Sequence, residues 1–322
     1  MNNYSWLQQK LHSVALSSQL MREVTFDVEV SLSSKESCQD DHVFVAGLAR
    51  SGTTTLLNAL YNSHNFASLT YEDMPFVLSP NLWSKLTPAK RHTEPVERAH
   101  GDGITVSTDS PEAFEEVFWK TFNDKDHESH EKFKTYISCI TKKYNKKRYL
   151  SKNNQNIRRL RVINEIFPNS QILIPFRDPI QHAFSLLTQH KKFIDEVKKD
   201  NFIFDYMEWI GHTEFGQGYT CIHPYALQFT DSKNINHWLE QWFLTYEDCL
   251  KLPIKRRNFN FICYESLCTK KESWINILKL TGIKNEYAFE FRESKKDVAF
   301  KINPELLAKC NSVYDELVNL SI

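Results

Sequence analysis

The stretch HVFVAGLARSGTTTLLNALY, residues 42–61, decides the fold of this chain. Its first part, HVFVAGLA at 42–49, is an almost continuous apolar run, which is typical of a strand buried on both faces. Its last part, TTTLLNALY at 53–61, has apolar residues at helical spacing. Gly47 and Gly52 lie close together here, although the whole chain has only eight glycines. The stretch therefore predicts a buried strand, a tight glycine loop and a helix, in that order.

The loop GLARSGTT at 47–54 has the pattern of a phosphate-binding loop that lacks its lysine. A strand-to-helix turn of small residues lets backbone N–H groups converge on an anion, and the helix dipole adds to the field. In an ATP or GTP hydrolase the lysine would stand at the position of Thr53, whereas the nearest cation here is Arg50. The alternative is a glycine turn that only joins strand to helix. The strong patterning on both sides favours an anion site.

Further strand and helix units follow along the chain. QILIPF at 171–176 is a second buried strand, and the RDP after it begins a helix that Asp178 can cap and Pro179 can start. An amphipathic helix is expected over 154–167, and NFNFICYE at 258–265 is a third strand candidate with a helix after it. Strands that alternate with helices predict a parallel sheet covered on both faces.

The remaining segments are less regular. Residues 4–23 have apolar residues at roughly helical spacing and predict an amphipathic helix, after which TFDVEVSLS at 25–33 alternates polar and apolar residues. The segments 71–121 and 190–235 have little regular pattern. Long irregular segments of this kind usually form lids or binding loops.

Composition excludes several classes of protein. Forty Lys and Arg balance forty Asp and Glu, so the chain lacks the net positive charge that is typical of proteins that bind nucleic acid. No apolar run approaches the roughly 20 residues of a membrane-spanning helix. The N-terminus lacks the basic and apolar regions of a secretory signal, so we expect a cytoplasmic protein. The seven cysteines contain no C-x-x-C pair, which disfavours a zinc or redox site.

Two ordered motifs resemble those of sulfotransferases that use 3'-phosphoadenosine 5'-phosphosulfate. The first is ARSGTT at 49–54, which is similar to the phosphosulfate loop of that family. The second, at 149–187, is similar to the family's lysine, helix, F-P turn, strand, R-D-P and a serine eight residues after the arginine. The likeness covers most of 43–190 and, weakly, 258–282. In motif style it is closest to bacterial members and to glutamate-base members such as tyrosylprotein sulfotransferases.

The resemblance implies an α/β fold of P-loop type, with a central parallel sheet and helices on both faces. Loop and helical insertions would form the acceptor side. We expect a single sulfotransferase domain over 1–322. Its parts would be an N-terminal helix and lead-in (1–40), a nucleotide-binding core (43–190), lid or acceptor loops (190–235), and C-terminal helices with one core strand (236–322).

The resemblance also implies which residues bind the donor. Arg177 and Ser185 would hold the 3'-phosphate, since arginine offers two parallel donors and serine a hydroxyl. Lys152 would lie over the bridging or sulfuryl oxygens, where negative charge develops as the phosphate leaves. Tyr264 in CYESL is a further nucleotide contact, and no metal ligand is expected. The 5'-phosphosulfate would be held by Arg50, Ser51, Gly52, Thr53, Thr54 and Thr55.

The acceptor's proton requires a base. Glu72 in LTYEDMPF lies 22 residues beyond Arg50, which is about the spacing of the glutamate-type members that this chain resembles. The alternatives are His100 and Asp102 in AHGDGI, where flanking glycines would let both side chains reach a cleft. Lys152, Arg50 and one of these three groups would form the catalytic set.

We therefore expect a sulfotransferase that moves a sulfuryl group to an acceptor hydroxyl by metal-independent in-line transfer. A carbohydrate or another small molecule is favoured as acceptor, with a lipid-linked glycan, a phenol and a peptide tyrosine also open. One alternative is a nucleotide-dependent phosphotransferase, which Thr53 in place of lysine disfavours. The other is a non-catalytic anion- or glycan-binding module, which Glu72 together with Lys152 disfavours.

Overall fold

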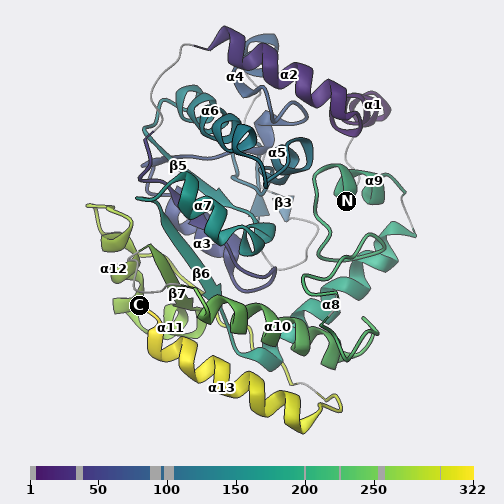
Figure 1. Cartoon of the computed structure of the whole chain (residues 1–322), viewed down its shortest axis with the longest axis vertical. Coiled ribbons are helices and arrows are strands. Elements are labelled where there is room, and N and C mark those ends of the chain that lie inside the picture. The colour runs from purple at the N-terminus through teal and green to yellow at the C-terminus, as the bar shows by residue number, and fades with distance from the viewer. Residues whose placement is uncertain are drawn as a thin grey trace.

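Five parallel strands form the central sheet of the molecule (Figure 1). Every neighbouring pair of strands in this sheet is parallel. The central strand is fully buried, which explains why its sequence is an unbroken apolar run. This arrangement confirms the predicted α/β class. In spatial order the strands are β2 (Phe66–Ala67), β5 (Arg148–Lys152), β1 (Val43–Val45), β6 (Gln171–Phe176) and β7 (Phe259–Cys263).

The computed structural model describes most of the chain, and every structural statement below concerns that part. A small antiparallel pair, β3 (Val96–Glu97) and β4 (Thr105–Val106), lies apart from the central sheet. Within the described residues, no helix combines the length and the apolar character needed to cross a membrane. The described residues are 5–33, 39–87, 96–97, 105–198, 201–224, 226–252, 258–297 and 299–322.

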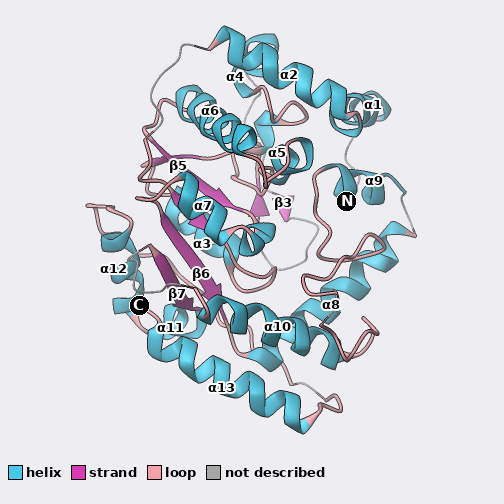
Figure 2. Cartoon of the chain, viewed as in Figure 1, coloured by secondary structure: helices cyan, strands magenta, loops and turns pink. Residues whose placement is uncertain are grey.

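Helices cover both faces of the sheet (Figure 2). Strand side chains alternate between faces, so Val43 and Val45 pack into one apolar cluster while Phe44 packs into the other. On the Val43 face lie α3 (Thr53–Tyr61), α11 (Tyr264–Thr269) and α12 (Lys271–Leu280). On the Phe44 face lie α6 (His127–Lys143), α7 (Leu160–Ile166), α10 (Ile235–Leu250) and α13 (Pro304–Leu320).

Helix α8 (Pro179–Val197) starts where β6 ends. The Asp178 side chain accepts the N–H of Gln181 at 2.8 Å, and Pro179 occupies the first turn, as the sequence predicts. The strand and its helix thereby place the residues after Phe176 at the carboxyl edge of the sheet. The other short elements are η1 (Tyr71–Asp73), α4 (Pro80–Leu86), α5 (Glu116–Thr121), η2 (Asn154–Arg158) and α9 (Asn201–Trp209).

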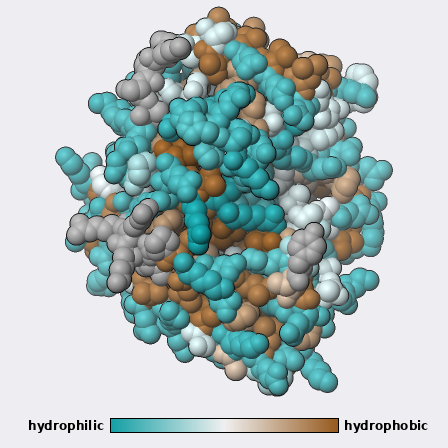
Figure 3. Space-filling model, viewed as in Figure 1, coloured by the Kyte–Doolittle hydropathy of each residue, from teal (hydrophilic) through white to brown (hydrophobic). Residues whose placement is uncertain are grey.

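The N-terminal region differs from the sequence prediction. Two helices, α1 (Trp6–Ser17) and α2 (Gln19–Leu32), replace the single helix expected over 4–23. Ser18 separates them, and its side chain accepts the N–H of Met21 to cap α2. The alternating segment 25–33 is helical because burial follows helical spacing, with Phe26 packed against Phe118 and Phe122. Hydrophobic residues on the outer side of these helices are visible at the upper end of Figure 3.

The helix expected over 154–167 is also interrupted. Its first turn is the 3₁₀ helix η2, and α7 begins only at Leu160. The Asn153 side chain accepts the N–H of Gln155 at 3.0 Å, and the Asn156 side chain donates to Glu115 at 2.7 Å. Such polar side-chain bonds compete with regular α-helical pairing. They hold the chain just after β5 in a fixed, non-α-helical path.

Candidate active site

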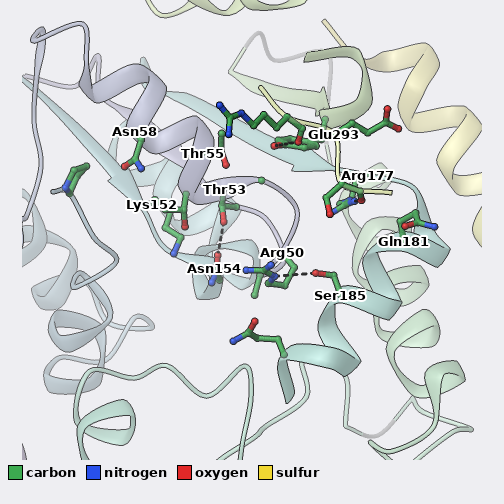
Figure 4. A pocket seen from close by; sticks show the side chains of 18 of the residues that line it. Arg50, Thr53, Thr55, Asn58, Lys152, Asn154, Arg177, Gln181, Ser185 and Glu293 are labelled. Atoms are coloured by element: carbon green, nitrogen blue, oxygen red, sulfur yellow. Dashed lines mark hydrogen bonds between the residues drawn. The ribbon is translucent and has the colours of Figure 1, made fainter. Parts of the chain in front are cut away.

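A cavity of about 1080 Å³ opens at the carboxyl ends of the central strands (Figure 4). The glycine loop with α3, the end of β5 and the α8 face from Gln181 to Lys192 contribute to its lining. So do the segments 107–111 and 289–296, together with Arg177, Phe215 and Tyr264. In open α/β sheets this edge is where ligands bind. We call it the loop cavity.

The glycine loop has a backbone that only its own sequence permits easily. Gly52 caps α3 with a φ of 92°, in the left-handed region that favours glycine. A Cβ at this position would lie 2.3 Å from the Tyr264 ring, so the ring packs directly on the loop. The first N–H groups of α3 have no partner within the helix, and they lie at the positive end of the helix dipole. The loop therefore has the backbone features of an anion site.

Arg50 also has a left-handed backbone, with a φ of 71°. For a residue with a side chain this conformation costs about 1–3 kcal/mol and persists only when its surroundings hold it. Its Nε donates to Oγ of Ser185 on α8 at 3.1 Å, and Figure 4 shows the two side chains pointing toward each other. The Thr53 hydroxyl donates to Oδ1 of Asn154 at 3.2 Å. These contacts join the loop to α8 and to the chain after β5.

Arg177 follows directly on β6 and is only 9% exposed. Its Nη2 donates to the carbonyl of Ser294 at 2.8 Å, and its guanidinium lies 5.8 Å from the centre of the Tyr264 ring. Its Nε is buried and makes no hydrogen bond within the described part of the chain, where the carboxylate of Glu265 lies 3.9 Å away. A buried donor without a partner is costly unless a ligand satisfies it. The residues at this end of the cavity thus suit an anionic group.

Lys152 is the last residue of β5, where it pairs in register with Val45 at the end of β1. Its ammonium lies 3.5 Å from Oε1 of Glu112, and both side chains are almost fully buried. Glu112 also accepts from the Tyr71 hydroxyl at 3.1 Å and from the N–H of Ala113 at 2.9 Å. Lys152 is therefore a buried cation held at the cavity wall beside the glycine loop.

Comparison with known proteins gives the family. The model of the sulfotransferase family matches residues 42–284, well over half of the chain. The chain belongs to the sulfotransferase family. No curated protein sequence matches it.

Several solved structures similar to this sulfotransferase come from bacteria. Sulfotransferase STF1 from Mycobacterium tuberculosis H37Rv has 12% identity and a TM-score of 0.47, with 96% of this chain and 81% of that chain covered. Sulfotransferase STF9 from Mycobacterium avium has 12% identity and a TM-score of 0.43, covering 98% and 79%. A sulfotransferase from Alicyclobacillus acidocaldarius has 15% identity and a TM-score of 0.44, covering 88% and 97%.

The sulfotransferase brings most of the expected donor-binding residues to one cavity. Ser51 is the exception, because it is fully buried and its hydroxyl donates to the carbonyl of Leu48 at 2.7 Å. Ser51 therefore stabilises the loop from inside. The expected residues that line the loop cavity are Arg50, Gly52, Thr53, Thr54, Thr55, Lys152, Arg177, Ser185 and Tyr264.

The first candidate base, Glu72, does not lie with the donor-binding residues. Glu72 is half-buried on η1, its N–H donates to the carbonyl of Thr108 at 3.0 Å, and it is not among the residues that line the loop cavity. It lies near the cavity-lining Tyr61: burial raises the pKa of Tyr61 to about 12, and the charges of Asp73, Asp109 and Glu72 add to this. Of these carboxylates, Asp109 lines the cavity itself.

The other two expected bases, His100 and Asp102, lie outside the described residues. The structure therefore gives no geometry for either of them. Among the residues that the structure does describe, no group of three or more His, Cys, Asp and Glu side chains is arranged to hold a metal ion.

Sequence reasoning missed an acidic segment that supports Lys152. Glu115 is fully buried and accepts from Ser151 at 2.5 Å, Asn156 at 2.7 Å, and the Tyr149 and Trp119 side chains at 3.2 Å. Burial raises the pKa of Glu115, although these donors oppose the shift.

Glu116 supports the residues that follow Lys152. It binds the guanidinium of Arg159 through two contacts of 2.7 and 2.8 Å and accepts from Asn153 at 2.8 Å. With Glu112 and Glu115 it belongs to EAFEE at 112–116. Three carboxylates among apolar residues are the only sequence signal for this role, and that signal is weak.

Proposed function

We propose that this sulfotransferase transfers a sulfuryl group from 3'-phosphoadenosine 5'-phosphosulfate to the hydroxyl of a carbohydrate or another small molecule. The observation that carries the proposal is the set of cations and backbone donors around one cavity. They are the α3 N-terminus with Arg50, the buried Lys152, and Arg177, whose Nε makes no hydrogen bond to any described residue. A nucleotide that carries a 5'-phosphate and a 3'-phosphate could place one on the glycine loop and the other against Arg177.

In this proposal the two phosphates occupy neighbouring sites. The 5'-phosphosulfate lies on the loop against Arg50, Thr53, Thr54 and Thr55, and the 3'-phosphate lies against Arg177 and Ser185. The contact between Arg50 and Ser185 favours this arrangement, because the Ser185 oxygen accepts from Arg50 and can still donate its own proton to a phosphate. Tyr264, which packs on the loop and beside Arg177, would contact the nucleoside.

The chemistry follows from charge development. The acceptor oxygen attacks sulfur opposite the bridging oxygen, the bond between sulfur and the bridging oxygen breaks, and its electron pair stays on the leaving phosphate. Lys152 and the loop N–H groups stabilise that growing negative charge. The acceptor's proton passes to Glu72, with His100 and Asp102 as the alternatives. In this scheme no step uses a metal ion.

Calorimetry with adenosine 3',5'-bisphosphate tests the donor site. The parent protein should bind this product, and Arg177→Ala should weaken it about tenfold to a hundredfold, since a charge-assisted contact contributes about 1.5–3 kcal/mol. Ser185→Ala should cause a smaller loss. Arg161→Ala, which removes an exposed arginine of α7, is the matched control. Equal binding by Arg177→Ala and the parent would contradict the proposal.

Two further measurements separate the alternatives. A phosphotransferase would bind ATP better than the bisphosphate and would lose activity when a chelator is added. A non-catalytic binding module would bind the bisphosphate but release no labelled product from a labelled sulfuryl donor. The proposed sulfotransferase prefers the bisphosphate, keeps its rate with chelator present and forms labelled product.

A further inference from the structure

A histidine of α8 lies beneath the glycine loop. His182 is fully buried, and its Nε2 lies 2.8 Å from the carbonyl oxygen of Ala49. Desolvation lowers the pKa of His182 to about 3, so the ring is neutral near pH 7 and carries one proton. Because a carbonyl can only accept, that proton is on Nε2, and His182 donates to Ala49.

The rest of the imidazole indicates why a histidine is there. Its Nδ1 is buried and has no hydrogen-bond partner among the residues that the structure describes. A buried acceptor without a partner costs free energy, so the Nδ1 atom by itself does not favour a histidine at this position. The bond to Ala49 is therefore the contribution that distinguishes His182 from an ordinary core residue.

The orientation of one peptide plane depends on this bond. The peptide between Ala49 and Arg50 is trans, so its C=O and N–H point in opposite directions. His182 lies inside the protein and does not line the loop cavity. Because the carbonyl of Ala49 is bound to His182, the N–H of Arg50 points away from that histidine.

The same helix also holds the Arg50 side chain. Ser185 follows His182 by three residues on α8, so the two lie on neighbouring positions of one helix face. His182 fixes the peptide before Arg50, and Ser185 accepts from the Arg50 guanidinium. Together they explain how a non-glycine residue keeps its left-handed backbone in the middle of the loop.

We propose that His182 is a positioning residue that holds the Ala49–Arg50 peptide so that Arg50 faces the 5'-phosphosulfate. This inference rests on the proposed function. It assigns His182 to the 5'-phosphate end of the donor and gives it no part at the 3'-phosphate end. The effect of His182 should therefore depend on which phosphate the ligand carries.

The test compares three nucleotides by calorimetry: adenosine 3',5'-bisphosphate, adenosine 3'-monophosphate and adenosine 5'-monophosphate. The affinity gained from the 5'-phosphate is the ratio of the first to the second, and the gain from the 3'-phosphate is the ratio of the first to the third. In H182L, which removes the donor, the 5'-phosphate gain should fall about tenfold, as expected for a lost anion contact. The 3'-phosphate gain should stay within about threefold of the parent.

Two more variants distinguish a positioning role of His182 from a general loss of stability. H182Q can donate from its side-chain amide and should restore most of the 5'-phosphate gain. H237L removes another buried histidine, on α10, which contacts Tyr219 and the carbonyl of Phe229, both at 2.7 Å. It should lower stability but leave both gains unchanged. If H182L does not fold, H182M, which is apolar and more flexible, replaces it.

The possible outcomes are distinct. If H182L or H182M keeps the full 5'-phosphate gain, or loses both gains equally, the role of His182 is refuted while the donor site stands. If the parent gains nothing from either phosphate, the proposed function itself fails, and this inference fails with it.

Discussion

Nε of Arg50 donates to Oγ of Ser185 over 3.1 Å, although the two residues are 135 positions apart in the sequence. One residue belongs to the glycine loop and the other to α8, so the contact crosses the loop cavity between the two motifs that identify the family. Each residue therefore affects the other's position. Removal of either side chain would take away the hydrogen bond that the other makes across the cavity.

Lys152→Ala should reduce turnover more than donor binding. The charge of Lys152 is needed most when the leaving oxygen becomes anionic, so its loss belongs mainly to the transition state. Arg50→Ala should behave in the same direction. Steady-state kinetics with a labelled sulfuryl donor, combined with calorimetry of the bisphosphate, checks this. Lys134→Ala, which removes a half-exposed lysine paired with Glu131, is the control. Equal losses of binding and turnover would assign Lys152 to ground-state anchoring.

Glu72→Gln tests the proposed base. Glutamine keeps the size and shape of the side chain but cannot accept a proton at neutral pH, so turnover should fall about 10²- to 10⁴-fold while bisphosphate binding survives. His100→Ala, Asp102→Asn and Asp109→Asn are the comparisons, since Asp109 lines the loop cavity. Turnover of Glu72→Gln within a few-fold of the parent, with one of the other three inactive, would transfer the role to that residue.

Gly52→Ala should damage the glycine loop. A Cβ there would require a left-handed alanine and would meet the Tyr264 ring, so we expect a loss of at least about 1 kcal/mol in stability and about tenfold in bisphosphate affinity. Thermal unfolding and calorimetry measure the two effects. Gly218→Ala is the matched control, because its Cβ would meet only the Phe204 ring at an ordinary 3.6 Å. Similar behaviour of the two variants would show that the loop tolerates a side chain.

Stability should fall on acidification below about pH 6.5. Burial lowers the pKa of His42 to about 4 and that of His182 to about 3, from an ordinary value of 6.5. The unfolded chain therefore binds these protons first, and each histidine reduces the unfolding free energy by about 1.4 kcal/mol per pH unit as the pH falls toward its folded pKa.

Urea unfolding at pH 7.5, 6 and 5 measures this effect. Glu115 acts in the opposite direction, because its raised pKa means that stability is lost as the pH rises. H182Q isolates one histidine: its stability should depend less steeply on pH than that of the parent. An equal slope in parent and variant would contradict the assignment of His182 as a neutral buried ring.

The sequence predicted those parts of the fold in which local pattern and burial agree. The helix at 53–61 and the strand at 171–176 have the predicted bounds, because apolar spacing and the residues that end each element point to one structure. Strand β5 escaped prediction because its buried residues include Ser151 and Lys152, whose burial depends on Glu115 and Glu112. The sequence did not predict helix α2 beyond residue 23, because a short stretch that alternates polar and apolar residues also fits a helix that buries Phe26.

The candidate site shows the same division. The motifs singled out Arg50, Lys152, Arg177 and Ser185, and all four line the loop cavity. Their spacing in the sequence follows from strands and helices of regular length. The motif did not show that Ser51 faces inward, because a side chain's direction in a tight loop depends on backbone angles. Contacts across the fold, such as that of His182 with Ala49, have no counterpart in local pattern.

The acidic segment at 112–116 has a consequence for recognising working members of this family by sequence. Both motifs could remain intact in a relative whose equivalents of Glu112, Glu115 and Glu116 were lost. Such a relative would keep the glycine loop and the arginine after β6, yet its lysine would lack the buried carboxylates that hold β5 and the turn after it. A search that used only the two motifs would count this relative as active. A search that also required acidic residues at the positions of Glu112, Glu115 and Glu116 would separate it from enzymes whose lysine is held in place.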